Sequence, residues 1–440
     1  MPKDRPLESY IWQLLKAGLA LAAVVIYSRY LGAAGRGSLS IYLLYVQMLL
    51  MVNELFVGSA LANWIAMYGL RRFLPRILCV SLSMLSLAAL LAWLGGITDN
   101  APVDLGNTAH LNPPYILLFL LLGWSAILIF QNVAMNFFQS RGEILEKNRW
   151  LVGFELLKVG GLITLIFGLS VQVVPLYYVV LSLVFSGFIW SILCLSRLAS
   201  LNAFTPHNKK ADLPSIRHTW NEGIWAQTGQ IVLFLVYRTP LLLTSYLMGD
   251  AAAGIFANTL LVIDTIWIFA NTLGAIVHGR ALGIFNELKR EKLGLRFATF
   301  SFWGTFLLSM GAVAIPMDWF ARVFGAEFDS MSGLLLQSLP GIWALGFFAP
   351  LGNLFHAQNQ FKQLLLHHTL GLVVMAVSVL IAHVIFASIT VTHLIWSWNF
   401  ALSTILGLHI FRRKFTHPQK GFFKVNTLLT YRLVRKFMRF

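Results

Sequence analysis

Long apolar runs separated by short polar gaps make up most of the sequence. Each run holds roughly the 20 residues that an α-helix needs to cross the hydrocarbon core of a bilayer. The pattern therefore predicts about twelve membrane-spanning helices. The second is long and predicts a break near Gly58. The predicted spans are 10–31, 39–66, 73–95, 114–138, 150–169, 174–196, 220–247, 252–278, 296–316, 331–355, 362–387 and 390–411.

Composition supports lipid as the solvent of this chain. Hydrophobic residues make up 58% of the 440 positions, charged residues only 11%, and the mean hydropathy is +0.73. Soluble domains carry about 25% charged residues, so this chain has too little polar surface for water. The first run lacks a small-residue cleavage pattern and is expected to stay as the first helix. The fold class predicted is an all-α polytopic membrane protein.

The basic residues lie in the gaps between runs, which explains the net charge of +16 without a nucleic-acid partner. When the N-terminus is placed in the cytoplasm, most of the 33 Lys and Arg fall in cytoplasmic gaps. The outer gap 96–113 contains Asp99 and Asp104 and no basic residue. The positive-inside rule thus predicts cytoplasmic N- and C-termini. Residues 425–440 place four cations on one helical arc, which favours a helix lying on the anionic leaflet.

The sequence gives little support to enzymatic activity. No Walker loop is present, and the outer gaps are too short for the large loop that carries catalytic carboxylates in membrane glycosyltransferases and polymerases. Cys79 and Cys194 both lie inside apolar runs, which disfavours a disulfide framework or a metal cluster. We expect no catalytic residues, no metal and no cofactor other than H⁺ or Na⁺ as a coupling ion.

The two halves of the chain resemble one another at an offset of 217 positions. After the first predicted span the chain has Gly32 and, five residues later, Gly37; after the seventh it has Gly249 and Gly254. Six helices in each half imply halves of the same orientation, related by an axis along the membrane normal and enclosing a central cavity. The predicted division is an N-terminal lobe 1–206, a C-terminal lobe 207–411 and a basic tail 412–440.

These residues carry a resemblance to a known family. The stretch 28–62 resembles the opening helix pair of the Wzx-type flippases, the polysaccharide-transport branch of the multidrug/oligosaccharidyl-lipid/polysaccharide (MOP) exporter superfamily. The stretch 237–282 resembles the start of that family's second lobe, and 324–328 its short amphipathic connection before the tenth helix. The resemblance implies a bacterial inner-membrane flippase that moves an undecaprenyl-pyrophosphate-linked oligosaccharide, with polysaccharide polymerase machinery and membrane lipids as partners.

Charged residues inside predicted spans are candidates for function, because a charge at the bilayer centre costs at least about 2.5–3.5 kcal/mol. Arg238 lies near the middle of its span, and Gln227 and Gln230 lie near the same helical face. A guanidinium suits a pyrophosphate, and a salt bridge to a neighbouring helix is the alternative. Lys16 either binds cargo or extends to the interface.

Carboxylates and amides complete the candidate set. Glu155 and Lys158, three residues apart, either pair with each other or line the cavity. Asp264 lies on a polar stripe and either couples transport to H⁺ or Na⁺ or pairs with Arg238. The remaining candidates are Glu54 for ion coupling, and Asn132 and Asn136, whose amides either bind sugar hydroxyls or hold helices together.

The sequence thus predicts a flippase for a lipid-linked oligosaccharide that works by alternating access of a cationic central cavity. A multidrug exporter of similar architecture is the first rival, and Arg238 argues against its acidic cavity. A major-facilitator transporter is a second rival, but its usual Gly-Asp-Arg-rich turn is absent from 68–76. A polymerase or glycosyltransferase is the third.

Overall fold

The computed structural model of the protein is helical throughout the residues it describes, with no strand among them. Those residues are 6–57, 61, 65, 70–94, 114–141, 143–169, 176–201, 216–282, 284, 286–358, 360–386 and 388–416. By length and apolar composition, eight of the described helices are candidates for crossing a membrane, or nine if one bent pair counts as a span. The chain is a multi-pass, all-α membrane protein. The predicted tail helix 425–440, the outer gap 96–113 and the break at Gly58 lie outside the described residues.

The helices follow the predicted spans one by one. Helix α1 (Pro6–Val57) covers the first predicted span and the second as far as Val57, and its backbone turns between them at Gly32 with φ 66° and ψ −176°. Two short elements, α10 (Met317–Phe324) and the 3₁₀ turn η2 (Ala326–Phe328), separate the ninth span from the tenth. The others are α3 (Leu70–Leu94), α4 (Pro114–Ser140), α5 (Ile144–Leu169), α6 (Leu176–Ser200), α7 (Ile216–Met248), α8 (Asp250–Leu282), α9 (Glu287–Val313), α11 (Met331–Ala357), α12 (Phe361–Ile385) and α13 (Val391–Thr416).

Two glycines that the 217-residue offset aligns, Gly32 and Gly249, both have a positive φ. Gly32 has φ 66°, and Gly249, between α7 and α8, has φ 84°. A positive φ is costly for residues that carry a Cβ and costs glycine little. Each therefore lets the chain leave one helix and enter the next in a tight turn. Sequence and backbone geometry agree on this point of the repeat.

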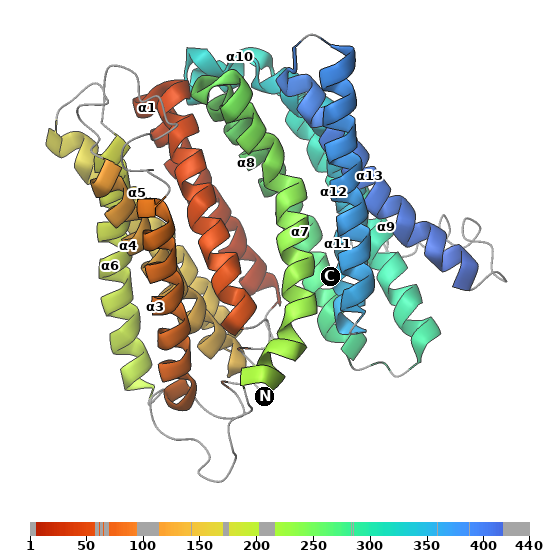
Figure 1. Ribbon diagram of the computed structural model, residues 1–440, viewed down its shortest axis with the longest axis horizontal. Helices are drawn as coiled ribbons and strands as arrows, with labels where there is room; N and C mark the ends of the chain where they lie inside the picture. Colours follow the sequence, from red (N-terminus) through yellow and green to blue (C-terminus); the bar gives the residue numbers. More distant parts are fainter. Residues whose placement is uncertain are drawn as a thin grey trace. The chain divides into compact units, whose positions relative to one another are not determined.

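The contacts divide the chain into two compact units. Unit 1 is Met1–Gln227 with Val323–Gly325, and unit 2 is Thr228–Arg322 with Ala326–Phe440. The division falls inside α7, whereas the predicted lobe boundary lies at 206/207. Figure 1 shows the helices of each unit running lengthwise beside one another.

In unit 1, α1 packs on α5, and α6 packs on both α4 and α5. The core is aromatic. Trp190 of α6 is only 1% exposed, stacks edge-on against Trp150 and Phe154 of α5, and donates its indole N–H to the Trp150 carbonyl at 2.9 Å. The hydrogen bond satisfies the polar atom of a side chain that is otherwise in an apolar site.

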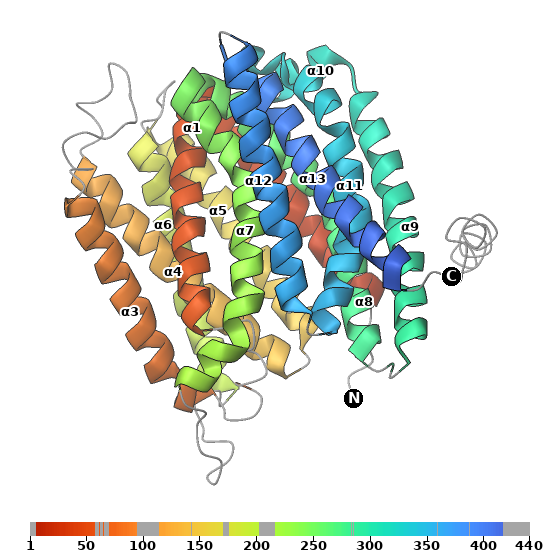
Figure 2. The ribbon, with the colours of Figure 1, turned by 45° about the vertical axis from the view of Figure 1, so that its right-hand side comes forward.

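In unit 2, α11 is the central helix and packs against α8, α9 and α13. Figure 2 shows α11 beside α9 and α12 beside α13, in agreement with their contacts. Helix α11 is apolar around its circumference and has no separate polar face, as expected for a segment surrounded by other helices. Of the spans in the described residues, the one that contains α11 is the most buried.

Helix α11 contains Pro340, and a side chain from α13 repairs the interrupted backbone. In an unbroken helix the Gly341 N–H would donate to the Gln337 carbonyl. Here the Asn399 amide stands between them: its Oδ1 accepts from Gly341 N at 2.9 Å, and its Nδ2 donates to Gln337 O at 2.8 Å. A Cβ at position 341 would lie 2.5 Å from that Oδ1, so glycine is needed there. Neighbouring side chains of this kind make proline tolerable in membrane helices.

Candidate functional site

An ionic cluster lies between α1 and α5 in unit 1. Lys158 Nζ is 2.6 Å from Glu155 Oε2 and lies 5.0 Å from the centre of the Phe154 ring. Lys16 of α1 interacts electrostatically with both Glu155 and Lys158. Glu155 is 6% exposed, so the carboxylate is held away from solvent. We call Lys16, Glu155 and Lys158 the ionic cluster.

The ionic cluster has two ammonium groups and one carboxylate. The pair that the three-residue spacing predicts is present, and Lys16 adds a second cation to it. One positive charge therefore exceeds the charge that the cluster's own carboxylate balances. Such an excess favours an anionic group as an additional partner. The role of these residues in transport stays a prediction.

A second polar group in unit 1 connects three helices through neutral amides. Asn132 of α4 donates to Glu54 Oε1 at 2.8 Å, and Gln227 of α7 donates to Glu54 Oε2 at 2.9 Å. Asn136 continues the chain by donating to Asn132 Oδ1 at 2.8 Å. Both oxygens of the Glu54 carboxyl group are thus satisfied, which makes its position in the helix bundle tolerable. Asn132 and Gln227 each connect their helix to Glu54 of α1, whereas Asn136 bonds to Asn132 within α4; binding of sugar hydroxyls by these amides stays a prediction.

Arg238 and Asp264 form an ion pair between α7 and α8 in unit 2. Arg238 Nη2 is 3.1 Å from Asp264 Oδ2, and the two side chains are 21% and 33% exposed. The sequence had offered this salt bridge as the alternative to cargo binding by Arg238 and ion coupling by Asp264. One terminal nitrogen of a guanidinium makes this contact, and the group has five N–H donors in all. Binding of a pyrophosphate by Arg238 and ion coupling by Asp264 stay predictions.

The three candidate residues of α7, which are Gln227, Gln230 and Arg238, contact three separate partners. Gln227 bonds to Glu54, Arg238 pairs with Asp264, and Gln230 Nε2 lies 2.8 Å from His356 Nε2 of α11. The three residues of the predicted helical stripe thus have different partners in the structure, and a shared role in binding stays a prediction. Each residue is positioned by a different neighbouring helix.

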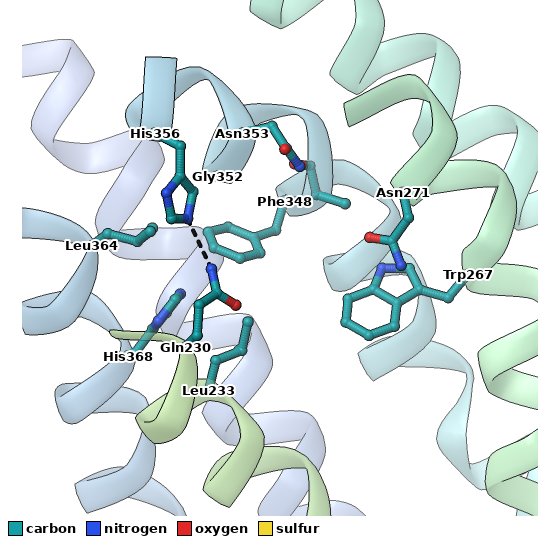
Figure 3. A pocket seen from close by; sticks show the side chains of 11 residues that line it. Gln230, Leu233, Trp267, Asn271, Phe348, Gly352, Asn353, His356, Leu364 and His368 are labelled. Carbon is teal, nitrogen blue, oxygen red and sulfur yellow. Dashed lines mark hydrogen bonds between the residues drawn. The ribbon is translucent and has the colours of Figure 1, made fainter. Parts of the chain in front are cut away.

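A cavity of about 330 Å³ lies within unit 2 beside Gln230. We call it the α7–α12 pocket, because α7, α8, α11 and α12 all contribute to it. Figure 3 shows Trp267 and Asn271 of α8 on one side and Gln230, His356 and His368 on the other, with Phe348 between. The lining residues are Gln230, Leu233, Trp267, Asn271, Phe348, Ala349, Gly352, Asn353, His356, Leu364 and His368.

Several of these residues were not found by sequence reasoning. His356 and His368 occur in different helices, and no short spacing or motif joins them to Gln230. His367 of α12 and His409 of α13 form another contact nearby, with their Nδ1 atoms 2.7 Å apart. No group of three or more potential metal ligands is present among the described residues. The signal available in the sequence was the presence of histidine inside apolar runs, which the candidate set did not use.

Comparison with solved structures identifies the fold. The chain superimposes on the lipid II flippase MurJ in an inward closed conformation with a TM-score of 0.64 and 11% identity, covering 92% of this chain and 87% of MurJ. A multidrug resistance MATE family transporter of the MOP superfamily, in an outward-facing conformation, gives 0.57 and 15% identity, with 93% and 94% covered.

A third match is a MOP superfamily transporter from Pyrococcus furiosus, for which a reverse polarity of the binding pocket suggests a different function. Its TM-score is 0.58 at 17% identity, with 94% of this chain and 95% of that chain covered. No protein-family model and no curated protein matches the sequence. The chain therefore has the fold of MOP superfamily transporters, and at these identities the likeness concerns the fold alone.

Proposed function

We propose that this protein moves an oligosaccharide linked to undecaprenyl pyrophosphate from the inner to the outer leaflet of the bacterial inner membrane, for surface polysaccharide assembly. The observation that carries the proposal is the ionic cluster, where Lys158 pairs with Glu155 and Lys16 adds a second cation that interacts electrostatically with both. An unbalanced cation in a membrane span is costly, and an anionic head group that binds there would reduce the cost.

The fold supports the proposal independently. MOP-type structures include a protein described as a lipid II flippase and others described as multidrug transporters. A polar head group cannot cross hydrocarbon alone, because each unpaired polar group costs several kcal/mol there. In this proposal both termini are cytoplasmic, and the protein works by alternating access. Transport is coupled to H⁺ or Na⁺ through Asp264, Glu54 or Glu155. The cargo is then delivered to polymerase machinery.

Export of small cations is the second candidate function. The observation in its favour is Glu54, a carboxyl group held by two amides in unit 1. A buried carboxyl group suits a cationic solute or a coupling ion. The surplus positive charge of the ionic cluster in the same unit opposes a cationic solute, so we place the flippase first.

The test uses the purified full chain in proteoliposomes that contain a lipid-linked oligosaccharide. A lectin added outside measures how much glycan becomes accessible with time. We expect the wild type to expose glycan, and the double variant Lys16→Gln, Lys158→Gln to do so about tenfold more slowly, because glutamine keeps polarity without charge.

Lys289→Gln is the matched control, because Lys289 is exposed in the first turn of α9 and takes no part in the ionic cluster. It should leave the rate unchanged. Wild-type liposomes that expose no glycan but accumulate ethidium would overturn the flippase proposal in favour of cation export.

A further inference from the structure

The α7–α12 pocket has a lining without formal charge. Among its eleven lining residues none is Asp, Glu, Lys or Arg. A bound cation would have no carboxylate to balance it there, and a phosphate would have no guanidinium or ammonium group. Since ionic ligands need such partners when they leave water, the lining favours a neutral ligand.

One polar atom of the lining residue His368 has no hydrogen-bond partner among the residues that the structure describes. His368 is 1% exposed, and its Nδ1 lies 2.7 Å from the Gly229 carbonyl. Because a carbonyl only accepts, that nitrogen carries the proton, and Nε2 is left as an acceptor. Nε2 has no hydrogen-bond partner, and Figure 3 shows the ring directed toward Gln230 and His356.

A second lining residue, Trp267, has a buried hydrogen-bond donor instead of a buried acceptor. The indole nitrogen of Trp267 is buried and has no acceptor. A buried donor and a buried acceptor without partners are each destabilising. A ligand that both donates and accepts, as a hydroxyl does, would satisfy both. The orphaned pair therefore indicates a hydroxyl-bearing partner.

Aromatic surfaces complete the chemistry of the pocket. The Trp267 ring stacks on Tyr237 with centroids 4.7 Å apart, which fixes its orientation. Phe348 is 5% exposed and packs edge-on against His368 with centroids 5.5 Å apart. Small-molecule sites typically combine apolar walls with a few placed polar groups in roughly 300–1,000 Å³. At about 330 Å³, this pocket suits one small ring system.

We infer that the α7–α12 pocket binds one uncharged sugar ring, a neutral hexose or N-acetylhexosamine. The inference rests on the proposed function, because such a ring would belong to the cargo's glycan. Hydroxyl groups would meet His368 Nε2, the Trp267 indole and the Gln230 amide, and the C–H face of the ring would lie on the aromatic walls. Asn271, an exposed member of the lining, adds a second amide. The pocket of unit 2 would thereby recognise the sugar through neutral groups.

The experiment measures saturation-transfer NMR on the purified full chain in detergent with glucose, galactose, N-acetylglucosamine and glucuronate, each alone. We expect at least one neutral sugar to bind and glucuronate to bind at least tenfold more weakly. Trp267→Phe keeps an aromatic ring at this position but removes the N–H together with part of the ring surface, and it should weaken binding about tenfold, since a site built for a hydroxyl depends on its polar groups. Asn271→Leu is the second variant; it removes a polar lining group without touching the aromatic walls and should weaken binding as well.

Trp303→Phe is the matched control, because Trp303 is 48% exposed on α9 and does not line the pocket. Absence of binding by every neutral sugar, or equal binding by glucuronate, would overturn the inference, and so would unchanged affinity in both pocket variants. The sugar-binding experiment and the lectin assay test different claims. Glycan transport without sugar binding removes only the pocket's role, whereas sugar binding without transport removes only the proposed function.

Discussion

The two units differ in the kind of polar group that their candidate sites contain. In unit 1 the ionic cluster concentrates charge: Glu155 and Lys158 pair within α5, and Lys16 of α1 interacts electrostatically with both. In unit 2 the α7–α12 pocket has only neutral lining groups, and the nearby charges of Arg238 and Asp264 neutralise each other. The difference teaches that a membrane protein can concentrate charged groups in one unit and line a pocket of the other with neutral groups alone.

The separation has a physical advantage. A sugar hydroxyl gains little specificity from a strong nearby charge, which attracts any ion or water, whereas neutral donors and acceptors at fixed positions require a matching partner. An anionic head group, in contrast, needs net charge and little geometry. Each of the following changes tests one side of this contrast.

The largest expected effect follows from reversing the charge of the ionic cluster. Lys16→Glu changes its balance from one surplus positive charge to one surplus negative charge. We expect surface polysaccharide in complemented deletion cells to fall by more than tenfold, because an anionic head group would now be repelled. Lys16→Arg should retain most of the polysaccharide. Equal output from the two variants, at equal protein levels, would show that the charge of Lys16 has no role.

The next effect concerns stability in unit 2, where neutral hydrogen bonds replace charge. Asn399→Leu leaves Gly341 N–H and Gln337 C=O without their side-chain partner. We expect a loss of about 2 kcal/mol in the free energy of unfolding, less than two full desolvation penalties because the helix can partly close. Unfolding in mixed micelles measures it. Ser397→Ala on the same helix is the control, since its hydroxyl bonds only to the His393 carbonyl one turn away.

The smallest effect is expected at the Arg238–Asp264 pair. If the pair is structural, Arg238→Gln and Asp264→Asn should each destabilise, and the double variant should recover about 1 kcal/mol of the summed loss, since both side chains are partly exposed. Thermal unfolding of the four proteins gives the coupling energy. Additive losses, together with slower glycan transport in Arg238→Gln alone, would instead assign Arg238 to the cargo and blur the contrast between the units.

The helices were accessible to sequence reasoning because each one is a long apolar run with a polar boundary. The turn at Gly32 was visible through its counterpart Gly249, since both recur at one offset. The pairing of Glu155 with Lys158 was also visible, because contacts within one helix depend only on spacing.

Partners between helices were not accessible in the same way. Gln227 meets Glu54 across 173 positions, and Gln230 meets His356 across 126. Helical periodicity says which face a residue occupies and nothing about which helix it faces. The pocket escaped for the same reason, because its histidines become neighbours of Gln230 only when α11 and α12 pack together.

The amide of Asn399 has a mechanical consequence. It donates to the Gln337 carbonyl on one side of Pro340 and accepts from the Gly341 N–H on the other. Both halves of α11 are therefore bonded to one side chain of α13. Sliding either helix along the other would break both bonds at once in a place that water does not reach. Helices α11 and α13 should therefore travel as one rigid block, and any motion in a transport cycle must be taken up by other helices.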